Sequence, residues 1–516
     1  MAGEYVIGVD VGTQGTKAAL FRTDGTLMGE GFASSKLHRP EPGVVEEDPE
    51  DQVTAACEAI SSCVETSGIT PREVAAISVD GQMAGILAVG KDGTHVTPYD
   101  SWLDTRCGPY IERMEAEAGD AIVEKSGMAP SFNHGPKVLW WKNERPSQFD
   151  RIRAFVQPGS YVAMRLGELS GEDAYIDKTY LHFSGFADNL NNTWDEGLCA
   201  QFGVPRDKLP HIRDSHEIVG ELSRNMAHRC ALTSGVKIVA GCGDTAASFL
   251  SSGGTSPGLC LDVAGTASVF AATTTEFRPD LRQRTLAASQ SAVPGLWNLF
   301  AYVNGGGMNL EWFRNDLLGS LGKECQASLG FAELERLAEK VGPESFFPIF
   351  VPHLAGRVTP ADPTIRGAWV GLEWAHDAGH LYRALLEAVA LEYGVYKEAL
   401  QQLYPGFEAS ELRITGGGEQ SVLWNEIKAT TLQLPVQQVV GSKGAPMGAA
   451  MVAAYAVGLF ESYEGAAGEW LKFGDRHEPN GELILHYRRK QKLYELALRS
   501  VSQFSREALR VTDDVQ

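Results

Sequence analysis

The chain has 516 residues, a length that favours two domains of roughly 250 residues each over a single core. Hydrophobic residues make up 43% of it and charged residues 22%, and no apolar run reaches the ~18–20 residues that span a bilayer. The net charge of −21 argues against binding to nucleic acid or anionic membranes. It also predicts that any phosphate site relies on backbone N–H groups and a metal ion, not on a lysine cluster.

The N-terminus has no basic stretch and opens directly into an expected strand, so we expect no signal peptide and a cytoplasmic protein. The cysteines are scattered without a CxxC pair: Cys57, Cys63, Cys107, Cys199, Cys230, Cys242, Cys260 and Cys325. We expect them to be small, mostly buried apolar residues rather than ligands of a structural zinc ion.

The first thirty residues predict a β-meander, in which strands alternate with turns: Tyr5–Val11, the turn Gly12–Gly15, Thr16–Phe21 and the hairpin signal Asp24-Gly25. A helix is predicted from about Pro49, with Asp48 as its N-cap. A strand over Val74–Val79 follows.

The turn-rich segment Ser251–Gly258 is the best linker candidate, and we place the domain boundary there, giving domains 1–252 and 253–516. After it come a strand over Leu259–Val263, a turn and a strand over Ser268–Ala272. Strand, Gly-Thr turn and strand thus occur at the head of both halves. With 56 glycines in the chain one such pair can arise by chance, but its placement favours an internal duplication.

The remaining part of the second half alternates helices with strands: Gly379–Leu400, Glu411–Thr415, Gln420–Leu432, Leu434–Val440 and Pro446–Val457. This alternation predicts an α/β domain with a mixed, mostly parallel sheet.

Asp10 lies at the end of the first strand, before the turn with Thr13 and Gln14. Such a turn can offer N–H groups and hydroxyls to phosphate oxygens, while Asp10 holds Mg²⁺ through waters. The alternative is a hairpin turn with an incidental aspartate; the spacing of a Walker A loop is absent. A second turn, Gly265-Thr266, has the same chemistry without the acid, and two facing turns would clamp a polyphosphate.

The segment Gly241–Ala246 allows two interpretations. Its glycines follow a strand, and Asp262 ends another strand about twenty residues on, as in a dinucleotide-binding fingerprint. However, Asp244 would then lie beside the pyrophosphate and repel it. In the other interpretation, Asp244 points into a cleft and accepts a proton from a substrate hydroxyl, as phosphoryl transfer requires. The structural alternative is that Asp244 is a helix N-cap.

Two further segments are candidates for ligand binding. The turn Gly416–Gly418 could lie flat beside a nucleobase or ribose, or be a plain tight turn. Gln82 and Met83, with Trp102, Asp104 and Arg106, would suit a polyhydroxylated ligand, which needs an aromatic face and charged hydrogen-bond partners. The competing account is a structural contact between Asp104 and Arg106.

With these residues in place, the chain resembles the FGGY family of carbohydrate kinases, and within it the xylulokinase-like, pentulose-kinase branch. The resemblance extends from Val9 to about Gly458. Its most specific part is Gly367–Leu372 followed by His380–Glu387, which is similar to the C-terminal signature of the family. Physically, this is a strand or turn leading into an amphipathic helix with Leu381, Leu385 and Val389 on one face.

The resemblance implies an α/β fold with two actin-like (ribonuclease H-like) ATPase domains around a central cleft that holds ATP, Mg²⁺ and sugar. Domain 1–252 would bind the sugar and carry the first phosphate loop, and domain 253–516 the second phosphate loop and the adenosine site. The resemblance also implies a role for each candidate residue. Asp10 would bind the metal, Asp244 would be the catalytic base, and the sugar would contact Gln82, Met83, Trp102 and Asp104. The first phosphate loop would contain Thr13 and Gln14, the second Gly265 and Thr266, and the adenosine site Gly417 and Gly418.

Two departures from the family pattern concern the sugar. Xylulokinases usually carry histidine where this chain has Ala84, and His134 replaces a small residue or proline in the N-terminal signature. We therefore expect an ATP-dependent kinase of a ketose, most simply a pentulose such as D-xylulose, with ribulose, erythrulose or a glycerol-like polyol as alternatives. From other classes, an NAD-linked polyol dehydrogenase and a non-catalytic ATP-binding scaffold stay open. The expected partners are the sugar and ATP, and a homodimer is the assembly considered.

Overall fold

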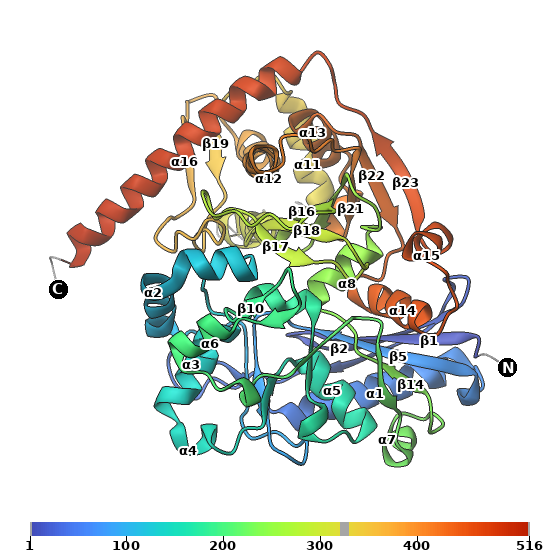
Figure 1. The fold of residues 1–516 in the computed structure, drawn as a ribbon. Coiled ribbons are helices and arrows are strands. Elements are labelled where there is room, and N and C mark those ends of the chain that lie inside the picture. The colour runs from blue at the N-terminus through green and yellow to red at the C-terminus, as the bar shows by residue number, and fades with distance from the viewer. Residues whose placement is uncertain (1–2, 320–329, 514–516) are drawn as a thin grey trace.

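The computed structural model describes residues 3–319 and 330–513, and its strands form two large sheets (Figure 1). The first has the order β13-β14-β5-β1-β2-β3, with β1 (Tyr5–Val11), β2 (Gly15–Arg22), β3 (Leu27–Ser34), β5 (Val74–Gly81), β13 (Ile218–Glu221) and β14 (Lys237–Val239). The second has the order β17-β18-β16-β15-β21-β22-β23, with β15 (Leu259–Ala264), β16 (Ser268–Thr274), β17 (Ala287–Gln290), β18 (Trp297–Val303), β21 (Glu411–Thr415), β22 (Val436–Val440) and β23 (Lys472–His477). Helix α8 (Asp244–Ser251) separates them in the sequence.

The two sheets share one pattern of strand pairing, although β17 has no counterpart in the first sheet, and the edge strand β13 precedes β14 in the chain whereas β23 follows β22. In each, an antiparallel hairpin (β1–β2 or β15–β16) is extended by another antiparallel strand, β3 or β18. On its other side the first strand pairs in parallel with β5 or β21, then come β14 or β22 in parallel and an antiparallel edge strand, β13 or β23. The duplication predicted from the two Gly-Thr turns is therefore confirmed, and so is the α/β class with two related units.

The start of helix α1 (Pro49–Ser67) lies at the predicted residue. The Asp48 carboxylate accepts a hydrogen bond of 2.9 Å from the N–H of Glu50, and proline at the first position needs no donor partner. The helix ends at Gly68, whose φ of 69° is left-handed and therefore favours glycine.

Helix α12 (Ala378–Leu403) differs from the amphipathic helix that was predicted. Leu385 and Val389 are buried, as expected, but the opposite faces are buried too. The reason is that α11 (Phe331–Val341), α13 (Val422–Leu432) and other elements pack around it. The start of α13 also differs from the predicted Gln420, because a 3-10 turn precedes the helix.

Helix α14 (Ala445–Ala456) comes from the second half of the chain but packs on the first sheet. A Cβ at Gly8 in β1 would lie 1.8 Å from the carbonyl oxygen of Pro446, so only glycine permits this approach. One core cluster accordingly contains Val6 from the first sheet and Val439 from the second, together with the apolar residues of α14. The two units therefore share packed apolar surface and do not meet only at a polar boundary.

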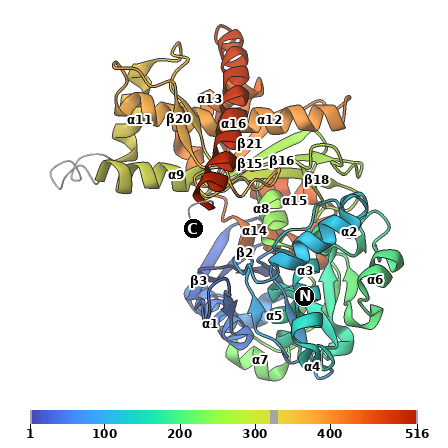
Figure 2. The same ribbon diagram turned by 90° about the vertical axis from the view of Figure 1, so that its left-hand side faces the viewer.

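The first unit carries an additional helical part built from the middle of its sequence. Helices α2 (Gly108–Ser126), α3 (His134–Glu144), α4 (Pro146–Phe149) and α6 (Glu196–Phe202) lie together on one side of this unit, with α1 on the other (Figure 2). They share an apolar cluster of their own. The C-terminal helix α16 (Ile484–Asp513) crosses the second unit, and its end extends beyond the body of the molecule (Figure 1).

The cysteines of the described residues are all free and buried, as expected; Cys325 lies outside the described residues. Across residues 3–319 and 330–513, no helix is long and apolar enough to cross a membrane.

Candidate active site between the two sheets

Three aspartates gather at the carboxyl ends of neighbouring strands in the first sheet. Asp10 in β1 is in register with Asp80 in β5, and Gly81 forms a bridge with Gly243, next to Asp244. Because β1, β5 and β14 are parallel, their carboxyl ends share one edge, where α/β sheets bind ligands. Asp80 is missing from the predicted site, although it follows an apolar strand just as Asp10 does.

Burial raises the pKa of all three carboxyl groups. The pKa of Asp244 is raised to about 7, first by desolvation and then by the charge of Asp10, while hydrogen bonds from Thr245 oppose the rise. Burial also raises the pKa of Asp10, against the effect of Lys17. Burial and the charges of Asp10 and Asp244 raise the pKa of Asp80 well above its ordinary range. A carboxyl group that titrates near neutrality is suited to accept a proton from a substrate hydroxyl.

The loop before α8 places Asp244 in the cleft. The N-cap of α8 is Gly243, and Asp244 is the first helical residue, so the alternative of Asp244 as the N-cap is wrong. Gly241 has φ 76°, and a Cβ there would lie 1.9 Å from the carbonyl oxygen of Val79. The N–H of Gly243 donates to Thr179 Oγ1 at 2.9 Å. The glycines thus let the loop pass tightly against β5, as the kinase interpretation requires.

The interpretation of this segment as a dinucleotide fingerprint is wrong. It needs Asp262 to face a ribose, but the Asp262 side chain is fully buried. Its carboxylate pairs with Lys428 and accepts a hydrogen bond of 2.7 Å from the Tyr393 hydroxyl. In addition, Asp244 lies in the first turn of α8, where it would repel a pyrophosphate.

A cavity of about 330 Å³ lies between the two units, lined by Asp10, Gly12, Lys17, Asp244, Thr245, Ser248, Phe249, Val263, Val269, Lys443, Gly444, Ala445 and Pro446. Its walls come from the turn after β1 and from α8 on one side, and from β15, β16 and the start of α14 on the other. Contrary to the expectation from net charge, two lysines line it, Lys17 and Lys443. Lys443 forms a 3.0 Å ion pair with Glu30 of β3.

In the first predicted phosphate loop, two backbone N–H groups are unpaired, whereas the hydroxyl of Thr13 already forms hydrogen bonds. Within the described part of the chain, the N–H groups of Thr13 and Gln14 have no acceptor. Thr13 Oγ1 donates to Gln82 Oε1 at 3.1 Å and accepts from Trp102 Nε1 at 2.9 Å. Gln82 Nε2 donates to Glu47 at 3.0 Å, which fixes the orientation of the amide. One chain of hydrogen bonds therefore links the phosphate turn to two of the predicted sugar residues.

The second turn is held by the start of α9 (Gly306–Trp312). The N–H of Gly307 donates to the carbonyl of Gly265, and that of Met308 to the carbonyl of Thr266, both at 3.0 Å. The N–H of Gly265 is bonded within the turn, whereas that of Thr266 has no acceptor among the residues described. The turn can therefore present at least one backbone donor to a phosphate.

The glycine turn predicted for adenosine lies at the same edge of the second sheet. Gly416 has φ 88°, and a Cβ there would lie 2.7 Å from the carbonyl oxygen of Ala264. A Cβ at Gly418 would lie 2.6 Å from the Cβ of Ala264, whereas Gly417 faces open space. The turn is packed closely against the end of β15 and presents bare backbone at Gly417.

Met83 and His134 meet beside the Asp244 loop. Met83 Sδ would lie 1.8 Å from a Cβ at Gly243, so glycine is required opposite it. His134 Nε2 lies 2.7 Å from the carbonyl oxygen of Met83, and burial lowers the pKa of His134 to about 4, so the ring is neutral and Nε2 donates. His134 Nδ1 is buried and has no partner in the described structure. The sequence departs from the family pattern at this residue, which was the only signal that could have placed it in the site.

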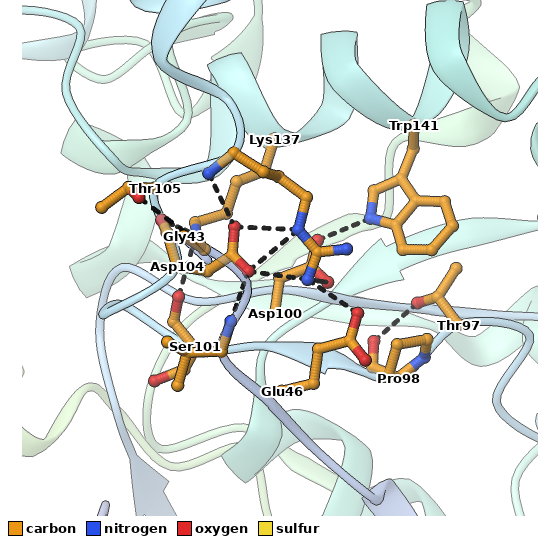
Figure 3. A network of polar contacts seen from close by, with 12 residues as sticks. Gly43, Glu46, Thr97, Pro98, Asp100, Ser101, Asp104, Thr105, Lys137 and Trp141 are labelled. Carbon is orange, nitrogen blue, oxygen red and sulfur yellow. Dashed lines mark hydrogen bonds and ion pairs between the residues drawn. The ribbon is translucent and has the colours of Figure 1, made fainter. Parts of the chain in front are cut away.

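Asp104 belongs to the charged network in Figure 3. Its buried carboxylate accepts hydrogen bonds from Arg106, at 2.6 Å to Nη2, and from the N–H of Val45 at 2.8 Å. Lys137 Nζ donates to the carbonyl oxygens of Ser101 and Asp104 at 2.8 and 3.1 Å. Both carboxylate oxygens of Asp104 are thus engaged, as in the structural alternative, and the network fixes the loop that carries Trp102.

The comparison with protein families identifies the family of the chain. The model of the FGGY family of carbohydrate kinases, N-terminal domain, matches residues 5–251, and that of the C-terminal domain matches residues 261–457. The chain belongs to the FGGY family of carbohydrate kinases. This FGGY kinase is 27% identical over 496 residues to a xylulose kinase of Bacillus subtilis (strain 168), covering 95% of this chain and 96% of the relative.

The names of other similar proteins include both glycerol kinase and xylulose kinase. A glycerol kinase of Deinococcus radiodurans is 28% identical, with 92% of this chain and 93% of the relative covered. The crystal structure of a xylulose kinase from Rhodospirillum rubrum has a TM-score of 0.87 and 25% identity, and the match covers 97% of this chain and all of that one. The protein is therefore a carbohydrate kinase, a phosphotransferase with an alcohol group as acceptor, and neither a dehydrogenase nor a non-catalytic scaffold.

Proposed function

We propose that this FGGY kinase transfers the γ-phosphoryl group of ATP to a primary hydroxyl of a ketose, a pentulose such as D-xylulose. The observation that carries the proposal is Asp244, a carboxylate of raised pKa in the cleft between two units of the same fold. The resemblance to xylulose kinases of two bacteria supports the choice of a pentulose. The departures at Ala84 and His134 are the reason to test other ketoses and polyols beside it.

In this proposal Asp244 is the general base. It accepts the proton of the attacking hydroxyl as the oxygen forms its bond to the γ-phosphorus and the bond to the leaving ADP oxygen breaks. Its pKa of about 7 matches this task, because a base is most effective when its pKa lies near the working pH. Thr245 Oγ1 donates to Asp244 Oδ1 at 3.0 Å and keeps that oxygen fixed, leaving Oδ2 for the substrate.

The residues present fit ATP with Mg²⁺. Asp10 offers a carboxylate at the cleft, and the backbone N–H groups of Thr13, Gln14 and Thr266 are unpaired within the described residues. These groups would hold the phosphates, with Gly265 and Thr266 on the second turn. Mg²⁺ bound with ATP would neutralise charge on the phosphates.

Gly417 and Gly418 are the proposed adenosine contacts, because their turn lies at the edge of the second sheet and Gly417 leaves its backbone uncovered. For the sugar we propose contacts with Gln82, Met83 and Trp102, the last of which is exposed on its loop. Asp104 would serve this pocket indirectly, by holding that loop through Arg106.

The test is a coupled ADP-release assay over tetruloses, pentuloses, hexuloses, pentitols, gluconate and glycerol, each with and without Mg²⁺. We expect kcat/KM to be highest for a pentulose and the rate to depend on Mg²⁺. A higher kcat/KM for glycerol or gluconate would overturn the choice of substrate and leave the kinase chemistry intact. We further propose a cytoplasmic homodimer, which light scattering and cell fractionation would test.

A further inference from the structure

Asp80 has an unusual environment for a buried carboxylate. Its side chain is fully buried, and neither carboxylate oxygen has a hydrogen-bond partner in the described structure. It is in register with Asp10 on the neighbouring parallel strand, so both side chains lie on the same face of the sheet. Lys17, in register with Asp10 on the other side, is exposed and lines the cavity.

Other buried acidic residues in the described part of the chain have partners. Three of them have a cationic and a hydroxyl partner each: Asp262 with Lys428 and Tyr393, Glu387 with Lys490 and Tyr487, and Glu392 with Arg357 and Tyr494. Asp177 has two hydroxyl partners, Thr179 and Ser215. A buried carboxylate without such partners costs several kcal/mol, so the structure normally compensates for it. The lack of a partner for Asp80 therefore indicates that a bound ligand supplies one.

We infer that Asp80 is a second carboxylate ligand, beside Asp10, of the divalent cation that accompanies ATP. The inference rests on the proposed function, in which Asp10 faces that cation. Mg²⁺ is commonly held by one or two carboxylates together with phosphate oxygens and waters, and the pair Asp10 and Asp80 supplies the oxygen donors. A cation would also reduce the repulsion between the two adjacent carboxylates, which the charge of Lys17 offsets only in part, since the pKa of both groups stays raised.

The experiment measures cation binding directly, with Mn²⁺ as the probe, by electron paramagnetic resonance titration with ADP at pH 8. Asp80→Asn preserves the shape of the side chain and removes its charge. We expect it to weaken Mn²⁺ binding about tenfold or more, as loss of a group that supports a metal site does. Asp177→Asn is the matched control, since Asp177 is equally buried but bonded to Thr179 and Ser215; it should leave the affinity within about twofold.

Wild-type affinity in Asp80→Asn, with weakened binding in Asp10→Asn, would overturn the inference and leave the proposed function standing; Asp80 would then be a neutral acid that shares a proton with Asp10. Wild-type affinity in both variants would instead remove Asp10 from the metal site and contradict the proposed function. A further measurement needs no variant. If two carboxylates form the site, Mn²⁺ alone raises the Tm of the wild-type protein without nucleotide, and an unchanged Tm would contradict the inference.

Discussion

Asp244→Asn should inactivate the enzyme and stabilise it at the same time. The pKa of Asp244 is raised from 3.8 to about 7, so above pH 7 the folded protein holds a carboxylate that the unfolded chain ionises far more easily. At 1.36 kcal/mol per pKa unit, this costs at most about 4 kcal/mol of folding free energy. Asparagine has no charge to bury and keeps an oxygen for Thr245, so the cost disappears while kcat falls about 10²–10⁴-fold.

The stability of the wild-type protein should fall as the pH rises. Because the folded pKa lies above the unfolded one, the folded state binds more protons between pH 4 and 7, and wild-type stability falls as pH rises through this range. The variant lacks this loss, so its stability advantage should grow by about 2.5 kcal/mol between pH 5 and pH 8. Urea unfolding at both pH values measures this difference in the ligand-free protein. Asp92→Asn, at an exposed turn, is the control: hydrogen bonds from Thr94 lower the pKa of Asp92, so it stays ionised from pH 5 to pH 8, and its removal should alter neither kcat nor the stability difference between the two pH values.

The reasoning would be refuted by a variant that keeps near-normal kcat with saturating sugar, or by an equal stability difference at both pH values. In the wild type, kcat/KM should fall as the pH drops below about 7, because protonated Asp244 cannot accept the hydroxyl proton. A rate that is flat from pH 6 to pH 8 would contradict this assignment.

Three other substitutions test the neighbouring contacts. Trp102→Phe removes the hydrogen bond to Thr13, worth on the order of 1 kcal/mol, and should raise the sugar KM about fivefold; Trp374→Phe, on a fully exposed side chain, should not. Ala84→His should raise kcat/KM for D-xylulose relative to the preferred sugar, and a wild type that already prefers D-xylulose strongly, with a variant that only loses activity, would contradict it. Gly8→Ala places a methyl group 1.8 Å from the carbonyl oxygen of Pro446 and should lower stability by at least 1–3 kcal/mol, whereas an unchanged Tm would show that α14 packs differently.

Local signals in the sequence were sufficient for many elements of the fold. The strands Tyr5–Val11 and Glu411–Thr415 occur at the predicted residues, because short apolar runs there are bounded by turn residues. The start of α1 follows from Asp48 and Pro49, whose capping chemistry acts within one turn. The duplicated topology followed from comparing two such local patterns.

Features that depend on contacts between distant residues were not predictable in the same way. Helix α14 is apolar on nearly all sides, which indicates burial but not that it covers Gly8 in the other half of the chain. Asp80 follows a strand as Asp10 does, yet only the register of β1 and β5 reveals that the two carboxylates are neighbours. The engagement of Asp104 by Arg106 was foreseen only as an alternative, because spacing alone cannot distinguish a ligand contact from an internal ion pair.

The apolar cluster around α14 also determines how the molecule can be divided. Residues 1–252 expressed alone would expose the face of β1 and β2 that α14 covers, including Val6 and Phe21, and would leave α8 without its neighbour. Contiguous uncovered apolar surface of this kind promotes aggregation. The boundary in the sequence before Leu259 therefore does not divide the apolar core into two separate parts. Calorimetry should record both units melting in a single cooperative transition, with neither half recoverable as an independent folding unit.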